Sequence, residues 1–396
     1  MSGIASSVAT RPSRRGVFHP IGLPGIMARQ DFFGQMLFVV TVQMILLLVA
    51  ISIDLAKYFD QVMSSAADAD LLGRIGLLAH YLGLRVIDIE TRLLPIGVFV
   101  GVLMFEVWSI LTRRRAIHWV SGRHPLRVLV PATAVGLVFG LLQYQMDVSW
   151  RPWAVLTQAA EKLGAYGERY ERGATRKSVW IRSADRLVRA RVRFGPPAEL
   201  VEVEMFRLDE AGRIREVLRA ERAEPTGWAD LWRFHGTTAW TRDPENPASM
   251  RVTVRPRDEL VAIPLHPLAV TYLGLPAKYV PDDDLRAIVA SKTDMLVGAD
   301  HRVWLEVRRA NALMPLAMAL LATVVSLFAG ATRPTLTTLV GCAFAGYALH
   351  VGNRVFVAAG ELERLEPVLA AWGPVLAALA AVPLLAAIAA LRQWRA

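Results

Sequence analysis

Six long apolar runs dominate the sequence, and most of them have the length that a helix needs to cross a lipid bilayer. A hydrocarbon core about 30 Å thick requires roughly 20 apolar residues in a helix, because lipid offers no partner for an unpaired backbone N–H or C=O. The runs cover residues 33–53, 93–111, 128–146, 310–331, 335–357 and 368–391. One such run is compatible with a soluble helical core, whereas six together predict a polytopic α-helical membrane protein with six transmembrane helices.

The charge distribution argues against a nucleic-acid-binding protein, although the chain carries a formal net charge of +10. Many basic residues lie beside the apolar runs, and residues 151–305 hold 25 bases against 22 acids. A region with so even a balance lacks the basic surface that nucleic-acid binding requires. The single cysteine, Cys342, excludes an intrachain disulfide, and a chain that is 54% hydrophobic is not a disordered one.

The positions of Lys and Arg in the short connections predict the orientation of the chain, because basic loops stay in the cytoplasm. The connection between the second and third runs carries five arginines and has no acid between residues 111 and 130. Arginines also precede the first run and follow the last, whereas residues 54–92 hold six acids and four bases. We expect both termini in the cytoplasm and the region 147–304 in the periplasm of a Gram-negative cell. The first run is too long for the core of a signal peptide, so we expect it to remain as an anchor.

The region between the third and fourth runs has the period of β-strands. Apolar residues alternate with arginines over residues 188–194 and with glutamates over 201–205, and Gly and Pro at 195–197 predict a turn between them. Such alternation is typical of strands with one buried and one exposed face. Further strands are expected at 178–181, 213–222, 231–240 and 251–254. Together they predict a small antiparallel β domain, with a helix before it at 153–171 and another beginning at residue 281.

The sequence contains no recognisable catalytic or metal-binding constellation. Neither a phosphate-binding loop of the Gly-x-x-x-x-Gly-Lys-Ser/Thr type nor a His-Glu-x-x-His motif occurs. His118 and His124 are the closest histidine pair, without a nearby carboxylate, and the acids at 282–284 suit the N-terminus of a helix. Glu106 lies in an apolar run near its cytoplasmic end, where we expect its side chain to reach the interface. We predict no catalytic residue and no metal site, which favours transport over an enzymatic function.

Four separate stretches, at 92–103, 178–182, 307–315 and 366–374, resemble segments of one known family in the same order. They are similar to its second span, to the Trp-bearing first strand of its β domain, to the entry of its fourth span and to the start of its sixth. The family is that of the lipopolysaccharide export permeases LptF/LptG (YjgP/YjgQ). The stretches near the first strand and the sixth span look more like the LptG branch than the LptF branch.

The resemblance implies six spans and a periplasmic β-jellyroll domain between the third and fourth. On this basis, residues 1–150 would form spans one to three, residues 151–305 the jellyroll-like domain, and residues 306–396 spans four to six. The chain would be the transmembrane permease subunit of an ABC-type export complex in the bacterial inner membrane. It would extract lipopolysaccharide from that membrane and pass it to a periplasmic bridge.

The resemblance also implies partners. They are a second six-span permease of the same family, a cytoplasmic ATPase dimer, periplasmic bridge proteins that include a single-span membrane subunit, and lipopolysaccharide itself. ATP would be used by the separate ATPase, so this chain would bind no cofactor and catalyse no reaction.

Two sets of site residues fit the function that the resemblance implies. Lys57 and Arg92, near the outer ends of the first two spans, are candidates to hold lipid A phosphates, unless they only anchor their helices at the interface. The connection 112–125 is the expected coupling helix, with Arg114, Ile117, Trp119 and Gly122 as candidates for contact with the ATPase. The family usually carries an acid about eight positions before that glycine, where this chain has Arg114. The same helix could instead lie on the inner leaflet, where arginines meet anionic lipid.

Three alternatives remain open at the level of sequence. A transporter of the same fold could move another envelope lipid. A polytopic enzyme acting on lipid-linked sugar could use the acids at 282–284. A membrane-anchored receptor could sense a ligand with its outer domain, although no cytoplasmic signalling domain is evident.

Overall fold

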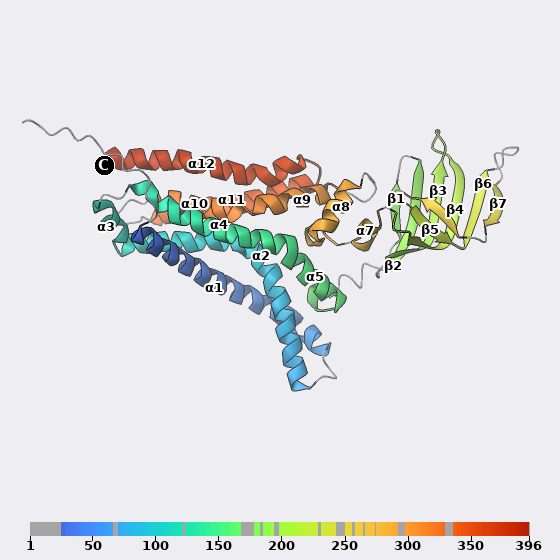
Figure 1. Cartoon of the computed structure of the whole chain (residues 1–396), viewed down its shortest axis with the longest axis horizontal. Helices are drawn as coiled ribbons and strands as arrows, with labels where there is room; N and C mark the ends of the chain where they lie inside the picture. Colours follow the sequence, from blue (N-terminus) through green and yellow to red (C-terminus); the bar gives the residue numbers. More distant parts are fainter. Residues whose placement is uncertain are drawn as a thin grey trace, which may run out of the picture.

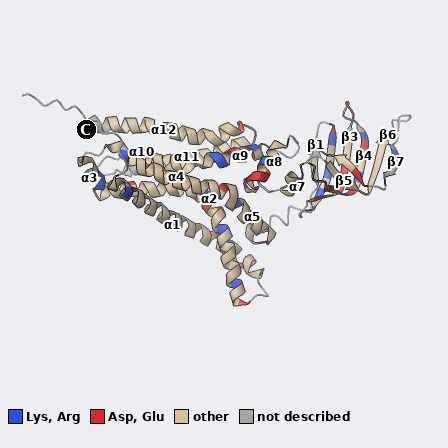
Figure 2. Cartoon of the chain, viewed as in Figure 1, with Lys and Arg blue, Asp and Glu red and all other residues tan. Residues whose placement is uncertain are grey.

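The structure is a computed structural model that describes residues 25–65, 70–121, 124–167, 178–182, 185–193, 198–228, 231–242, 250–255, 258–263, 266–273, 275–291, 298–328 and 336–395. Its two main parts, a helical body and a β sheet, lie at opposite ends of an elongated molecule (Figure 1). The helical body combines segments from before and after the sheet in the sequence. Charged side chains gather on the sheet and at the end of the body nearest to it, while the rest of the body carries few (Figure 2).

The helical body contains long helices joined by short helical turns. The first half of the chain supplies α1 (Ile26–Ser64), α2 (Leu71–Leu111), α3 (Arg114–Val120), the 3₁₀ turn η1 (Pro125–Val128), α4 (Leu129–Gln145), the π-helical turn η2 (Met146–Trp150) and α5 (Arg151–Ala160). The second half supplies α7 (Pro267–Thr271), the 3₁₀ turn η3 (Ala277–Tyr279), α8 (Asp282–Ala290), α9 (Ala299–Asn311), α10 (Met314–Leu327), α11 (Leu336–Glu361) and α12 (Pro367–Arg395).

Several of these helices have the length and hydropathy of membrane spans. Within the described residues, four segments qualify alone: Ile26–Ser64, Leu71–Leu111, Pro125–Ala160 and Pro367–Leu391. A fifth arises if α9 and α10, which meet at a bend of 49°, form one broken span. Pro315 explains this break, because it has no N–H to donate to the carbonyl of Asn311.

The fifth predicted run, at 335–357, forms most of α11, which is 26 residues long. This helix is not among the qualifying segments, since His350, Asn353 and Arg354 interrupt its apolar sequence. Apolar helices of spanning length are therefore confirmed, while the number of six spans stays a prediction.

Two pairs of glycines allow close helix packing within the body. Gly97 and Gly101 of α2 face α1, and a Cβ at Gly101 would overlap the backbone of Val39. Gly136 and Gly140 of α4 face the region where α9 meets α10 in the same way. Small residues four positions apart commonly let helices approach each other in membranes. As a result α2 packs closely on α1, and it also contacts α10.

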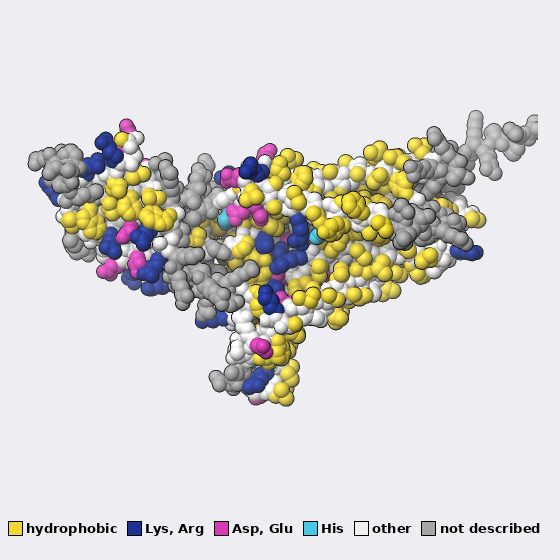
Figure 3. All heavy atoms as spheres, turned by 180° about the vertical axis from the view of Figure 1, so that it is seen from behind, with side chains coloured by type: hydrophobic (Ala, Val, Ile, Leu, Met, Phe, Trp, Pro, Cys, Tyr) yellow, Lys and Arg dark blue, Asp and Glu magenta, His cyan; other side chains and the backbone are white. Residues whose placement is uncertain are grey.

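The face of the helical body seen in Figure 3 is predominantly hydrophobic. On α1, only 17% of the most apolar stretch is buried, and Phe33, Leu37, Met44 and Leu48 are all exposed. In water such a surface would be unfavourable, whereas lipid or another transmembrane protein covers it without cost.

Within the part of the chain that the structure describes, eight antiparallel strands form one sheet in the middle of the sequence. They are β1 (Val179–Arg182), β2 (Arg186–Arg193), β3 (Glu199–Leu208), β4 (Ile214–Pro225), β5 (Leu231–His235), β6 (Thr237–Arg242), β7 (Met250–Arg255) and β8 (Glu259–Ala262). The order is β1-β2-β3-β4-β5-β8, and β6 pairs with both β4 and β7. The long strand β4 binds β6 through residues 216–219 and β5 through residues 222–225, so the sheet branches there. The predicted antiparallel sheet is confirmed, and its description as a jellyroll stays a prediction.

Alternation along the strands gives the sheet its apolar interior. Val188, Ala190 and Val192 of β2 are buried, and Trp232 and Phe234 of β5 are fully buried. Arginines and glutamates occupy the opposite positions and form cross-strand ion pairs, most of them exposed. Because exposed ion pairs contribute little, the apolar interior supplies most of the stability of the sheet.

Two predicted segments differ from the structure. The helix expected at 153–171 ends at Ala160 in α5, because Lys162 and Gly164 adopt left-handed backbone conformations that terminate it. Residues 168–171 of that prediction lie outside the described residues. The strand expected at 231–240 is two strands, β5 and β6, separated by Gly236 with φ of 65°. The helix predicted from residue 281 is confirmed as α8.

Candidate functional site

A polar cavity of about 270 Å³ lies at the end of the helical body nearest to the sheet. Its walls come from α2, α4, α5, α9, α10 and α11, together with the turns η2 and η3. The charged side chains that line it are four cations, Arg92, Arg151, Lys278 and Arg354, and two acids, Asp147 and Glu361. Figure 3 shows Lys and Arg side chains gathered at this level, where the hydrophobic surface of the body ends. The cavity is therefore a polar space with more basic than acidic side chains, and it lies at the edge of the hydrophobic surface of the body.

Asp88 of α2 organises the wall of this cavity. Its carboxylate is fully buried and accepts hydrogen bonds from Tyr166 at 2.7 Å and from Arg151 at 3.1 Å. Arg85 pairs with it at 2.9 Å, and Arg92 also donates to it. Burial raises the pKa of the Tyr166 phenol, so this hydroxyl stays protonated and donates to Asp88. Three guanidinium groups thus converge on one carboxylate that water does not reach.

Asp147 forms a second polar junction in the same wall. It accepts hydrogen bonds from Gln143 at 2.9 Å and from Asn311 at 3.0 Å, and Arg151 lies 3.4 Å from its other oxygen. Arg151 consequently bridges the carboxylates of Asp147 and Asp88. These contacts fix η2 and α5 against α2 and α9, so Arg92 and Arg151 serve partly as structural cations.

The other two cations of the cavity lack a carboxylate partner among the described residues. Arg354 Nε lies 3.2 Å from His350 Nε2, and Lys278 Nζ lies 5.0 Å from the ring centre of Tyr279. Neither contact neutralises a positive charge. An anionic group that enters this cavity would therefore find two cations available for charge-assisted hydrogen bonds.

The structure does not bring the two sequence-predicted lipid ligands into one site. Arg92 lies in the cavity wall with 38% of its side chain exposed, but it is already paired with Asp88 and bonded to Tyr166. Lys57 is exposed on α1 beside the ring of Tyr58 and is not part of the cavity lining. The cavity adds Arg151, Lys278 and Arg354, which the sequence analysis did not select.

Only one of these additional cations carries a signal in the sequence. Arg354 lies in the fifth apolar run, and an ionisable residue inside such a run is a functional candidate. Arg151 follows the polar end of the third run, but Lys278 has no such signal because it reaches the cavity only through the fold.

Two of the three acids at 282–284 are engaged in structural contacts, and Asp283 is exposed. Asp282 pairs with Arg308 at 3.2 Å and with Arg286 at 2.5 Å, and Asp284 accepts a hydrogen bond from Tyr272 at 2.5 Å. Together they occupy the first turn of α8, as predicted for a helix N-terminus. Among the residues that the structure covers, no group of three or more His, Cys, Asp or Glu side chains suits a metal ion.

The predicted coupling helix corresponds to α3, at the end of the molecule away from the sheet (Figure 1). Ile117 and Val120 point outward, with 61% and 90% of each residue exposed. Trp119 is half-buried and packs against Val128 and Leu327, so it faces into the molecule. Gly122 lies outside the described residues.

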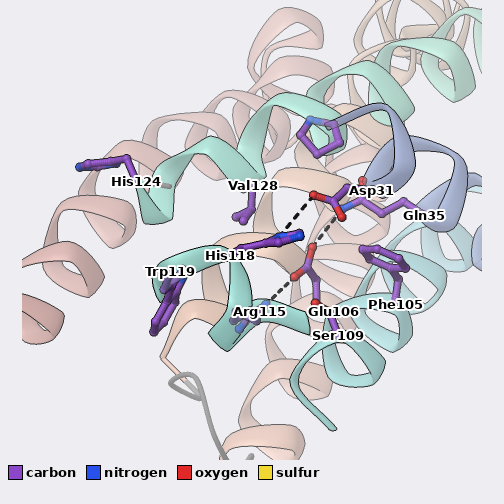
Figure 4. A pocket seen from close by; sticks show the side chains of 11 residues that line it. Asp31, Gln35, Phe105, Glu106, Ser109, Arg115, His118, Trp119, His124 and Val128 are labelled. Atoms are coloured by element: carbon purple, nitrogen blue, oxygen red, sulfur yellow. Dashed lines mark hydrogen bonds and ion pairs between the residues drawn. The ribbon is translucent and has the colours of Figure 1, made fainter. Parts of the chain in front are cut away.

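Arg114, one of the candidates for contact with the ATPase, has partners within this chain. Its guanidinium lies 3.1 Å from Asp31 of α1 and stacks near the ring of Trp108. The same carboxylate lies 3.9 Å from His118 Nδ1 (Figure 4). Arg114 therefore joins α3 to α1.

A buried ion pair joins α3 to α2 (Figure 4), and hydrogen bonds from the same arginine join α3 to α10. Arg115 forms an ion pair with Glu106 of α2 and donates to the carbonyl and hydroxyl of Ser326 in α10, both at 2.9 Å. Gln35 of α1 donates to the other oxygen of Glu106 at 2.9 Å. The prediction that the Glu106 side chain reaches the membrane–water interface is wrong. Glu106 is only 3% exposed, and Arg115 compensates its charge inside the protein.

Comparison with known proteins identifies one matching family. The model of the family described as lipopolysaccharide export system permease LptF/LptG matches residues 32–387, nearly the whole chain. The matched range includes the cavity wall, the sheet, and α3. No curated protein matches the sequence.

Proposed function

The chain belongs to the LptF/LptG family of lipopolysaccharide export permeases, and we propose that it is the transmembrane permease subunit of an ABC-type export complex. The family places the protein in the inner membrane as a permease subunit and not an enzyme. We propose that it extracts lipopolysaccharide from that membrane and passes it to a periplasmic bridge.

The basic cavity is the observation that carries this proposal. The lipid A part of lipopolysaccharide joins anionic phosphates to apolar acyl chains. Lys278 and Arg354 line the cavity, and neither pairs with a carboxylate among the described residues. A phosphate held there would leave its acyl chains beside the hydrophobic helices, so both parts of the lipid would meet surfaces of suitable polarity.

The proposed topology has six spans, with both termini in the cytoplasm and residues 151–305 in the periplasm, where the sheet formed by β1–β8 would be the jellyroll-like domain. The arrangement of the elements supports it: the start of α1, the helix α3 and the end of α12 share the end of the molecule opposite to the sheet (Figure 1). Residues 1–150 and 306–396 would then form the two halves of the membrane part. Lipid would leave the cavity toward the interior of the sheet.

Three protein partners complete the proposed complex. A second six-span permease would cover exposed apolar helix faces such as that of α1. A cytoplasmic ATPase dimer, which would use the ATP, would bind at α3. Bridge proteins, including a single-span membrane subunit, would receive the lipid from the sheet.

The test is ATP-dependent lipid release from vesicles that contain the full chain, its paired permease and the ATPase. Transfer of lipopolysaccharide to a bridge protein, with little transfer of phosphatidylglycerol, is the expected result. Preferential release of a different envelope lipid would favour a same-fold transporter of that lipid. Turnover of a lipid-linked sugar without any release would overturn the proposal in favour of an enzyme.

A further inference from the structure

A helical arm projects sideways from the outer end of the helical body. The first part of α2, residues 71–85, leaves the body at a bend, and the end of α1 lies beside it (Figure 1). Pro95 lies inside α2, where it removes one backbone hydrogen bond and favours a kink. In Figure 1 the arm runs across the direction of the long helices, so it would run along the surface of a bilayer that those helices cross.

The arm is held in place by contacts on one of its faces. Tyr81 is fully buried and donates to Asp54 of α1 at 2.7 Å, and Arg85 pairs with the same carboxylate at 2.5 Å. Tyr81 also packs with Val62 and Leu163 in a small apolar cluster. These contacts brace the arm against α1 and against the segment after α5 without using its opposite face.

That opposite face is apolar and exposed. Leu71, Leu72 and Ile75 are 74%, 77% and 55% exposed, and at positions i, i+1 and i+4 they share one side of the helix. In Figure 3 the hydrophobic side chains of the arm lie on the edge turned away from the β sheet, and its charged side chains lie on the sheet side. The apolar edge thus points toward the level of the membrane, and the polar edge toward the region outside it.

We propose that this arm is an interfacial membrane-binding element whose Leu71, Leu72 and Ile75 insert into the outer leaflet of the inner membrane. A helix that lies in the bilayer surface has an apolar side buried below the headgroups and a charged side above them. The arm has this distribution, it is continuous with a spanning helix, and its fold does not depend on the three exposed side chains. It would hold the permease at a fixed depth and contact the leaflet beside the basic cavity.

The test uses a fluorescent label on Leu72→Cys in a Cys342→Ala chain, reconstituted without other proteins in phosphatidylcholine vesicles. Brominated acyl chains quench neighbouring fluorophores, so we expect about twofold quenching, as at the lipid-facing control Leu48→Cys. Labelled Trp228→Cys, on an exposed loop of the sheet, should be quenched by aqueous iodide and not by brominated lipid. Iodide quenching alone at position 72 would overturn the proposal, and protection from both quenchers would do so too, because another protein segment would then cover the face.

Discussion

Arg151 Nε lies 3.1 Å from Asp88 Oδ1, joining two residues 63 positions apart in the sequence. This contact binds the start of α5 to α2 and closes the wall of the basic cavity. Asp88 is also the acceptor for Arg85 and Arg92, so one buried carboxylate compensates charge from two separate helices.

Replacing Asp88 with Asn is expected to destabilise the permease strongly. The amide has nearly the same shape but no charge, which leaves buried Arg151 and Arg85 less compensated, and breaking a buried ion pair typically costs about 3–5 kcal/mol. The measurements are the melting temperature and the folded yield in detergent. Asp60→Asn, on the exposed surface of α1, serves as the control and should melt like the wild type. Equal melting temperatures for all three proteins would show that Asp88 does not organise the wall.

Arg92→Ala and Lys57→Ala are expected to differ in their effects on stability and lipid binding, although the sequence suggested the same role for both residues. Arg92→Ala should lower both the melting temperature and lipid binding, because Arg92 pairs with Asp88 and also lines the cavity. Lys57→Ala should leave the melting temperature unchanged, since its side chain is exposed. Photocrosslinking to lipopolysaccharide is measured beside thermal stability. A loss of crosslinking in Lys57→Ala equal to that in Arg92→Ala would mean that the lipid reaches beyond the cavity.

Arg354→Gln is expected to weaken lipopolysaccharide binding about tenfold at low salt while preserving the fold. Its guanidinium has no carboxylate partner in the described structure, so its removal leaves no acid uncompensated. The difference from the wild type should shrink as salt rises, because mobile ions screen the attraction. Arg213→Gln, on an exposed turn of the sheet, is the matched control. A salt-independent loss in Arg354→Gln would indicate a packing defect and not a lost charge.

Sequence features that depend on neighbouring residues predicted much of this fold. Apolar length revealed the long helices, and alternation around Val188 revealed the strands. Features that depend on distant contacts were not predictable in this way. Glu106 was expected at the interface because its partner Arg115 lies on a different helix. The pairing of Arg92 with Asp88 is a different case, because the two residues lie four positions apart on α2 and only their burial depends on the fold. Lys278 joins the cavity only because the chain returns to the helical body after the sheet.

The proposed topology predicts opposite accessibility at the two ends of the molecule. In a Cys342→Ala chain, a cysteine at Trp180, which is 55% exposed on the sheet, should react with an impermeant maleimide in intact spheroplasts. A cysteine at Val120 in α3 should react only after the membrane is broken. The reverse pattern would place the sheet in the cytoplasm and exclude the proposed path of the lipid.

The outward and inward faces of α3 are expected to have separable effects on the ATPase. The double variant Ile117→Ser and Val120→Ser should reduce copurification of the ATPase with little change in the melting temperature, because both side chains are mostly exposed. Trp119→Ala should instead lower stability by about 2 kcal/mol, since it removes a half-buried ring that packs against Val128 and Leu327. Thr112→Ser, at the exposed end of α2, is a neutral control. If the double variant binds the ATPase as the wild type does, and only Trp119→Ala loses it, then the partner recognises the inner face of α3, and the helix must turn outward on binding.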